Sequence, residues 1–383
     1  MDIRQEVIEA FHKQFLEAPT LLVRAPGRVN LIGEHTDYND GFVMPLAIDR
    51  AVWIALRPRH DTIVRVSSLD FEAPITFSLD NMVRHENKTP TEYAKGVAWA
   101  LQEAGYILKG FEGVMKGDVP IGAGLSSSAA FELSMARAFC AVSGIEWEPK
   151  KMALLSQKAE NQWIGVKTGI MDQMISATGQ ADHAILIDCR SLDLEAAPLP
   201  KDAFVVVLDT GTRRGLVGSA YNERREQCEA AAAHFGVTKL RDVDLETFEA
   251  RADELDEITR QRARHVITEN KRTQDAKEAM RSGQIKRLGE LMDASHVSMR
   301  DDFDISSPAL NAIVDCAQSH PGCYGARMTG GGFGGCAVAL VKANQVDDFV
   351  EQVTACYMRS TNLNPSVYVC RATNGASLES LEG

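Results

Sequence analysis

A loop near the N-terminus gathers side chains suited to binding a polyhydroxylated ligand. Residues 27–45 read GRVNLIGEHTDYNDGFVMP, with an apolar border around Arg28, Asn30, Glu34, His35, Asp37, Tyr38, Asn39 and Asp40. Short carboxylates and an imidazole each exchange several hydrogen bonds with neighbouring hydroxyls, so this lining favours sugar binding. Two alternatives stay open from the residues alone: a divalent cation held by Glu34, His35 and Asp37, and a solvent-exposed turn.

A second chemically suggestive segment is the glycine loop PIGAGLSSSAA at residues 120–130. Gly122 and Gly124 permit backbone angles that turn successive N–H groups around an anion, and the helix expected next adds unpaired N–H donors and a positive dipole end. The three serines can cap that helix or offer hydroxyl ligands to Mg²⁺. A plain glycine turn with serine caps is the alternative, but the density of glycines and hydroxyls favours phosphate binding. The loop lacks the lysine of a Walker P-loop.

The glycine cluster at residues 330–335 satisfies GxGxxG without being a dinucleotide fingerprint. That fingerprint needs a helix after the glycines and an acidic residue about 20 positions later. Here residues 336–341 have a strand pattern and position 355 is Ala. We interpret the cluster as a tight hairpin-like loop that brings backbone close to a ligand or to another loop.

Two acidic residues lie in the segment ENQWIGVKTGIMDQ at residues 160–173. Glu160 falls near the end of an expected helix, and Asp172 follows a glycine turn. On the residues alone, each is typical of a helix cap or a surface charge. The spacing does not assign a catalytic role to either.

Composition excludes several classes of protein. The 383 residues are 45% hydrophobic and 25% charged, and 53 acidic against 41 basic residues give a net charge of −12. A negative net charge opposes electrostatic attraction of the whole protein to nucleic acid or to an anionic membrane. Binding of any phosphate group must therefore depend on the residues directly around it. The eight cysteines contain no CxxC pair, and we expect reduced, mostly buried thiols. No signal-peptide pattern or apolar run of membrane-spanning length is present, so we expect a cytoplasmic protein.

The elements that must position these loops alternate between strands and helices. We expect strands at 21–26, 48–57, 63–68, 74–77 and 111–118, and helices at 90–104, 127–143 and 149–164. Two short apolar runs, 184–187 and 204–208, lie on either side of the expected domain boundary. After an almost wholly helical stretch from 219 to about 300, the pattern gives helix 308–319, strands 323–328 and 336–342, helix 346–357 and strand 366–371. The last ten or so residues are expected to form a loose tail. This α/β (α+β) alternation and the length predict two domains, residues 1–198 and 199–383.

Taken together, the loops resemble the galactokinase family. GRVNLIGEHTDYNDG is similar to that family's first motif, while PIGAGLSSSAA and MTGGGFGG resemble motifs shared by the wider superfamily of galacto-, homoserine, mevalonate and phosphomevalonate kinases. The resemblance extends over nearly the whole chain. It implies two α/β domains with the active site in the cleft between them, the C-terminal one ferredoxin-like. It also implies ATP- and Mg²⁺-dependent phosphorylation of α-D-galactose at the C1 hydroxyl, giving galactose 1-phosphate and ADP in galactose catabolism.

The resemblance also implies roles for individual residues. Asp172 in GIMDQ matches the family's catalytic aspartate, and Arg28 in GRVN matches the arginine beside it. The matched sugar contacts are Glu34, His35, Thr36 and Asp37 in GEHTD, Gly169, and Tyr221 in SAYNERR. The phosphate loop matches Gly122, Ala123, Gly124, Leu125, Ser126, Ser127 and Ser128, and the positions associated with Mg²⁺ are Ser128 and Glu160.

Other functions stay open beside this one. A kinase of the same architecture for N-acetylgalactosamine, arabinose or galacturonate is the nearest, and galactokinase-like transcriptional inducers are another. Those inducers lack residues in the SSSAA stretch, which is complete here at 126–130, so we favour catalysis. A nicotinamide-dependent oxidoreductase would depend on the glycine cluster rejected above. We expect no partner beyond galactose and ATP, and a monomer.

Overall fold

The computed structural model describes residues 2–120, 122–212 and 217–381. Its largest sheet has six strands in the order β13-β1-β3-β6-β4-β5. All neighbours are antiparallel except β4 and β6, which are parallel. The strands are β1 (Leu21–Asn30), β3 (Pro45–Pro58), β4 (Ile63–Ser68), β5 (Ile75–Ser78), β6 (Phe111–Gly117) and β13 (Ser377–Glu379).

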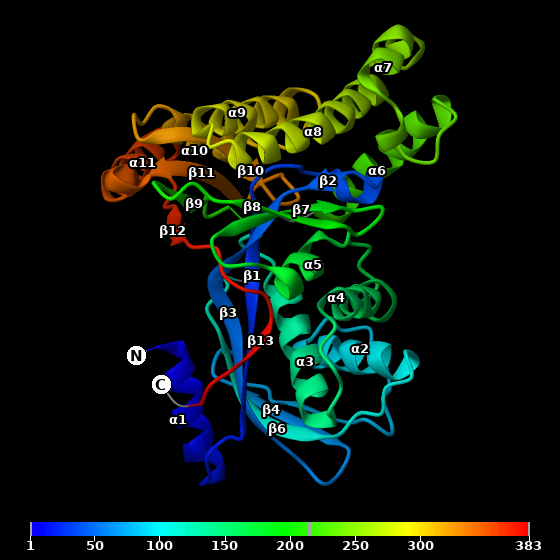
Figure 1. Ribbon diagram of the computed structural model, residues 1–383, viewed down its shortest axis with the longest axis vertical. Helices are drawn as coiled ribbons and strands as arrows, with labels where there is room; N and C mark the ends of the chain where they lie inside the picture. Colours follow the sequence, from blue (N-terminus) through cyan, green and yellow to red (C-terminus); the bar gives the residue numbers. More distant parts are fainter. Residues whose placement is uncertain (1, 121, 213–216, 382–383) are drawn as a thin grey trace.

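Helices cover both faces of this sheet (Figure 1). On one face, Val7 and Phe11 of the N-terminal helix pack against Leu22 of β1. The other face is covered by the helices that carry the glycine loop and the acidic segment, which are largely apolar toward the sheet. Because both faces are buried, β1 is a nearly continuous buried run rather than an alternating one. The helices are α1 (Ile3–Phe15), α2 (Pro90–Glu103), α3 (Ser127–Ser143), α4 (Pro149–Lys158) and α5 (Met171–Thr178).

A four-stranded antiparallel sheet forms the second half in the order β10-β11-β9-β12. With helices between β9 and β10 and between β11 and β12, this is the βαββαβ arrangement of a ferredoxin-like fold, as expected. Its strands are β9 (Ala203–Asp209), β10 (Cys323–Thr329), β11 (Cys336–Lys342) and β12 (Ser366–Cys370). The helices are α6 (Val217–His234), α7 (Leu245–Arg251), α8 (Glu257–Arg281), α9 (Ile285–Asp301), α10 (Pro308–Gln318) and α11 (Val346–Thr361).

A small third sheet joins the N-terminal loop to the middle of the chain. It pairs β2 (Phe42–Val43) with β7 (His183–Asp188), and β7 with β8 (Leu194–Pro198). In Figure 1 this sheet lies between the large sheet and the helices α8 and α9. The end of the polar loop at residues 27–45 is therefore held where the two halves of the molecule meet. In the described ranges, no helix is long and apolar enough to cross a membrane.

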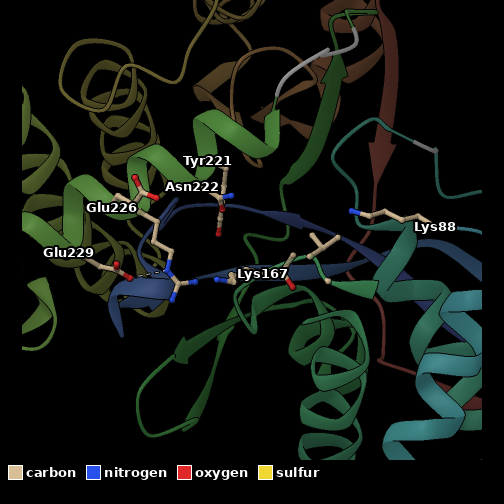
Figure 2. A pocket seen from close by; sticks show the side chains of 10 residues that line it. Lys88, Lys167, Tyr221, Asn222, Glu226 and Glu229 are labelled. Carbon is tan, nitrogen blue, oxygen red and sulfur yellow. Dashed lines mark hydrogen bonds and ion pairs between the residues drawn. The ribbon is translucent and has the colours of Figure 1, made fainter. Parts of the chain in front are cut away.

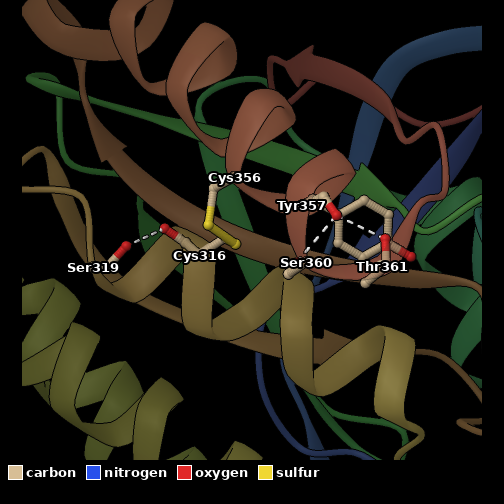
Figure 3. Close-up of a disulfide and its surroundings, with 6 residues drawn as sticks. All are labelled: Cys316, Ser319, Cys356, Tyr357, Ser360 and Thr361. Carbon is tan, nitrogen blue, oxygen red and sulfur yellow. Dashed lines mark hydrogen bonds between the residues drawn. A yellow bond between two sulfur atoms is a disulfide. The ribbon is translucent and has the colours of Figure 1, made fainter.

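Two expectations about the C-terminal half are wrong. The last residues are not a loose tail, because Ser377–Glu379 form β13 and pair with β1 at the edge of the first sheet. The cysteines are not all reduced, because Cys316 of α10 and Cys356 of α11 form a disulfide (Figure 3). This bond joins the two helices that pack on one face of the ferredoxin-like sheet. Cysteine spacing in the sequence does not identify which cysteines pair, and a three-residue strand is too short for hydrophobic periodicity to detect.

The expected helix at 149–164 has a different final turn. Its α-helical part ends at Lys158, and Ala159–Ile164 form a π-helical turn. Such turns are rare and recur at functional sites, where the wider turn changes the direction of one side chain. Here the π turn carries Glu160, which is 5% exposed. The acidic side chain that resembled a surface charge is thus directed into the protein.

Candidate active site

Asp172 and Arg28 form a bidentate ion pair at the centre of the candidate site. The Nε and Nη2 atoms of Arg28 each donate to one carboxylate oxygen of Asp172 at 2.7 Å. Arg28 extends from β1, and Asp172 lies in the first turn of α5. The hydroxyl of Ser126 also donates to Asp172. These contacts fix the orientation of a carboxylate whose side chain is still 29% exposed, which leaves it accessible to a ligand.

The glycine loop lies directly against this pair. Gly122 and Gly124 have φ of 73° and 74°, and Ser126, a residue type that seldom has positive φ, is at 58°. The carbonyl of Gly124 accepts from Arg28 Nη1 at 2.5 Å, and that of Leu125 accepts from the Arg28 backbone N–H at 3.0 Å. The loop backbone is therefore fastened to Arg28 and leads into α3, whose first-turn N–H groups have no partner within the helix. This arrangement fits an anion beside Asp172.

A small cavity of about 140 Å³ opens next to Asp172. It brings together segments from the N-terminal loop, α5, α6 and the second glycine cluster. Of the predicted sugar contacts, Glu34, His35, Asp37, Gly169 and Tyr221 line it, as do both residues of the ion pair; the remaining lining residues are Gly33, Thr168, Met171, Gly330 and Gly331. Thr36 is not among the lining residues: its hydroxyl donates to the backbone oxygens of Gly33 and Phe42. Thr36 shapes the loop from behind.

His35 has an unusual backbone and an aromatic surrounding. Its φ is 60°, a strained value of the kind found at functional sites. Its ring lies against Tyr221 and Phe303, with centroids 5.2 and 5.0 Å away, and its Nδ1 is 2.8 Å from the hydroxyl of Tyr38. These contacts orient the imidazole toward the cavity as a fixed hydrogen-bonding group.

Glu34 is engaged by the C-terminal half of the chain. Its carboxylate accepts from Arg327 Nη2 at 2.6 Å, from the Gly330 N–H at 3.0 Å and from Asn30 Nδ2 at 3.1 Å. Arg327 is fully buried, and burial raises the pKa of Glu34 while the Arg327 charge opposes that rise. Glu34 therefore links the polar loop at residues 27–45 to β10 and to the second glycine cluster. Arg327 directly precedes the MTGGGFGG motif, but no pattern in the sequence marks it as the partner of Glu34, and sequence reasoning missed it.

The second glycine cluster has the role expected of it. It joins the antiparallel strands β10 and β11, and a Cβ atom at Gly330 would lie 3.7 Å from the Gly124 carbonyl oxygen. The two glycine loops are thus in contact, and the cluster also contributes Gly330 and Gly331 to the cavity. No helix follows the glycines, which confirms the rejection of a dinucleotide fingerprint.

Glu160 lies below the cavity, close to the start of α3. Its Oε2 accepts from the Thr168 hydroxyl and from Gln173 Nε2, each at 2.8 Å. Burial is the main cause of its raised pKa, which a hydrogen bond from Ser128 partly opposes. Ser128 and Glu160, the two residues matched to Mg²⁺, are therefore neighbours. In the described part of the chain, no group of three or more His, Cys, Asp and Glu side chains could hold a metal by itself.

Two larger hollows flank the small cavity. One, of about 680 Å³, shares Thr168 and Tyr221 with it and is bordered by charged residues of α6. Figure 2 shows Lys88 extending toward this hollow from the side opposite α6, with Lys167 between them. The other, of about 380 Å³, shares Lys88 with the first and is mostly apolar; its lining includes Phe71, Tyr93, Val119, Phe131, Ser127 and Ser128. The apolar hollow therefore begins where the glycine loop ends.

The close approach of Gly169 to Asp37 gives a first testable prediction. A Cβ atom at residue 169 would lie 1.7 Å from Asp37 Oδ2, so Gly169→Ala must displace that carboxylate. Loss of a hydrogen bond to a charged group costs about 1.5–3 kcal/mol, so KM for galactose, the sugar that the resemblance implies, should rise by about 10–100-fold. In an Asp37→Ala background the same substitution should have no further effect. Equal effects of Gly169→Ala in both backgrounds would contradict this coupling.

The acidity of Asp37 predicts a pH dependence of sugar binding. Burial and the nearby charge of Asp172 raise the pKa of Asp37 from 3.8 to about 6. The ionised carboxylate is the better acceptor for sugar hydroxyls, so KM for galactose should rise as pH falls through about 6. Unfolding would not explain this rise. The folded state binds the Asp37 proton more tightly than the unfolded chain does, so Asp37 increases the free energy of unfolding as pH falls from 6 toward 4. Asp37→Asn should remove the inflection, and its persistence in that variant would assign it to another group.

The fold and the site define a small-molecule kinase of the galacto-, homoserine, mevalonate and phosphomevalonate kinase class. The family models for the N-terminal and C-terminal domains of these kinases match residues 92–180 and 276–358, and the galactokinase galactose-binding signature matches residues 9–58. A mevalonate kinase crystal structure has the same fold, with a TM-score of 0.66 and 18% identity over 93% of this chain and all of that one.

More similar proteins narrow the class to one family. Galactokinase of Roseiflexus sp. (strain RS-1) is 47% identical over 375 residues, which are 97% of this chain and 96% of that protein. The crystal structure of Lactococcus lactis galactokinase complexed with galactose has a TM-score of 0.91 and 36% identity, and covers 97% of this chain and 98% of that one. The chain belongs to the galactokinase family.

Proposed function

We propose that this protein transfers the γ-phosphoryl group of ATP to the C1 hydroxyl of α-D-galactose, giving galactose 1-phosphate and ADP. The observation that carries the proposal is the position of Asp172: its oriented carboxylate lies between a small cavity lined by polar groups and a glycine loop that begins a helix. Sugar and phosphate would thus meet at one carboxylate. The galactose-binding signature over residues 9–58 supports galactose as the sugar.

Asp172 and Arg28 have different roles in the phosphoryl transfer. Asp172 orients the C1 hydroxyl and accepts its proton as the oxygen attacks the γ-phosphorus in line. Arg28 holds that carboxylate in place and offsets negative charge on the transferring oxygens. The bond from Arg28 Nη1 to the Gly124 carbonyl joins this pair to the phosphate loop. Because the transition state of phosphoryl transfer is loose, orientation and electrostatics supply most of the rate.

The donor set at the base of α3 fits Mg²⁺. Ser128 and Glu160 offer a hydroxyl and a carboxylate, which are hard oxygen ligands, and phosphate oxygens would complete the coordination. When bound, Mg²⁺ neutralises charge on the phosphates. Within the protein, the Thr168 hydroxyl donates to the Glu160 carboxylate and helps to orient it.

The apolar hollow beside Ser127 and Ser128 is our proposed site for the nucleotide base. Its aromatic and aliphatic lining suits a flat ring. Because Ser127 and Ser128 border it at the end of the glycine loop, a base bound there would leave the loop itself to hold the phosphates. Tyr93 and Phe131 are the side chains that we expect to border the base.

The compartment and the assembly remain predictions. We propose a monomer in the cytoplasm, supported by the net charge of −12, which opposes self-association. The Cys316–Cys356 bond would be unusual in that compartment. Counting reactive thiols in protein prepared without exposure to oxidants tests whether the bond forms there.

An assay of ADP release with different sugars tests the proposed function. With ATP and Mg²⁺, we expect turnover with galactose and much weaker turnover with N-acetylgalactosamine, arabinose, galacturonate and glucose. Preference for another sugar would move the protein to a kinase of that sugar. Tight galactose and ATP binding without ADP release would point instead to a sugar sensor.

A further inference from the structure

A buried hydrogen-bonded chain leads away from the proposed metal ligand and is not explained by substrate binding. Gln173 follows Asp172 in the first turn of α5 and is fully buried. Its Nε2 donates to Glu160 Oε2 at 2.8 Å and to Glu132 Oε2 at 3.0 Å. Glu132 lies on α3 and is also fully buried. A neutral amide therefore stands between two buried carboxylates.

The positions of these residues connect the two ends of the proposed metal site. Ser128 and Glu132 are four residues apart on α3 and so share one face of that helix. Ser128 lies close to the Glu160 carboxylate, while Glu132 reaches Glu160 through Gln173. Because Asp172 and Gln173 are adjacent in α5, the Gln173 contacts also hold the turn from which Asp172 extends toward Arg28.

Burial of polar atoms that lack hydrogen-bond partners costs free energy of folding. Glu132 Oε1 and Gln173 Oε1 are buried without a hydrogen-bond partner in the described residues. An apolar pair of the same size would avoid that cost. Partners that orient a metal ligand commonly change metal affinity when they are replaced.

We propose that Gln173 is a positioning residue that orients Glu160 for the divalent cation, and that Glu132 holds the Gln173 amide in place. This inference rests on the proposed function, since it takes Glu160 as a ligand of Mg²⁺. It assigns no contact with sugar to either residue, because neither lines the small cavity.

Manganese binding to the enzyme–ADP complex, followed by electron paramagnetic resonance of free Mn²⁺, tests the inference. Gln173→Met removes the donor at nearly constant volume and should weaken Mn²⁺ binding by about 10–100-fold. Glu132→Gln keeps an oxygen that accepts from Gln173, so affinity near that of the wild type is expected. KM for galactose should stay unchanged in Glu132→Gln.

A double variant separates positioning from simple stabilisation. In Glu132→Met/Gln173→Met both partners become apolar, so Tm should recover relative to Gln173→Met while Mn²⁺ binding stays weak. Wild-type Mn²⁺ affinity in the folded double variant would overturn the inference. If Glu132→Gln lost as much Mn²⁺ affinity as Gln173→Met, the role assigned to Glu132 would be wrong.

Glu160→Ala distinguishes failure of the inference from failure of the function beneath it. If Glu160→Ala binds Mn²⁺ like the wild type, Glu160 is not a metal ligand and that part of the proposed function is wrong. If Glu160→Ala loses Mn²⁺ binding while Gln173→Met keeps it, only the positioning role is wrong.

Discussion

Replacing Asp172 by Asn should lower kcat by about 10²–10⁴-fold while galactose still binds. The amide has nearly the same shape as the carboxylate, so the cavity is preserved, but it cannot accept the C1 proton or match the charge of Arg28. Steady-state kinetics give the loss in kcat, and isothermal titration with galactose shows whether binding survives.

The matched control for this substitution is Asp253→Asn. Asp253 is 98% exposed and pairs only with Arg260 among the residues that the structure describes, so kcat should stay at its wild-type value. Full turnover in Asp172→Asn, with intact sugar binding, would remove Asp172 from the mechanism. A loss of binding together with turnover would instead show that the substitution disturbed the cavity.

Replacing Glu34 by Ala should have the largest effect on stability among the site residues. Arg327 is fully buried, and without Glu34 its guanidinium loses the carboxylate that compensates its charge. Removal of one partner of a buried ion pair costs about 3–5 kcal/mol, which urea denaturation would show as a lower free energy of unfolding. Galactose binding should also weaken, by roughly 1–3 kcal/mol, because sugar hydroxyls lose an acceptor.

Two further variants isolate the cause of that instability. Glu34→Ala/Arg327→Met removes both charges and should regain most of the lost stability. Asp37→Ala changes the same loop, but among the described residues the Asp37 carboxylate accepts a hydrogen bond only from the Tyr38 backbone N–H, so the substitution should weaken galactose binding with a smaller change in stability. Equal destabilisation by Glu34→Ala and Asp37→Ala would contradict the role assigned to Arg327.

The parts of this site that sequence could predict are those written as local patterns. Gly122, Gly124 and the three serines predict a phosphate loop because their residue types restrict what the backbone there can do. The strands and helices around them follow from periodicity, and the ferredoxin-like half was expected from the resemblance and is confirmed.

What sequence reasoning missed depends on contacts between distant segments. Asp172 looked like a helix cap, and only its pairing with Arg28, 144 residues away, distinguishes it from one. Arg327 and Glu34 are farther apart still, and neither carries a local signal of the pair. Glu160 looked exposed because a regular helix was assumed, whereas the π turn directs it inward. Resemblance to a known family supplied the roles of Asp172 and Glu160 that the residues alone did not.

A crystal structure with galactose and a non-hydrolysable ATP analogue is the most direct test of the account. We expect the triphosphate to lie against the backbone amides of residues 122–128, and the C1 hydroxyl of galactose to lie within hydrogen-bonding distance of Asp172 and in line with the γ-phosphorus. A triphosphate bound elsewhere, or a sugar whose C1 hydroxyl faces away from Asp172, would contradict it.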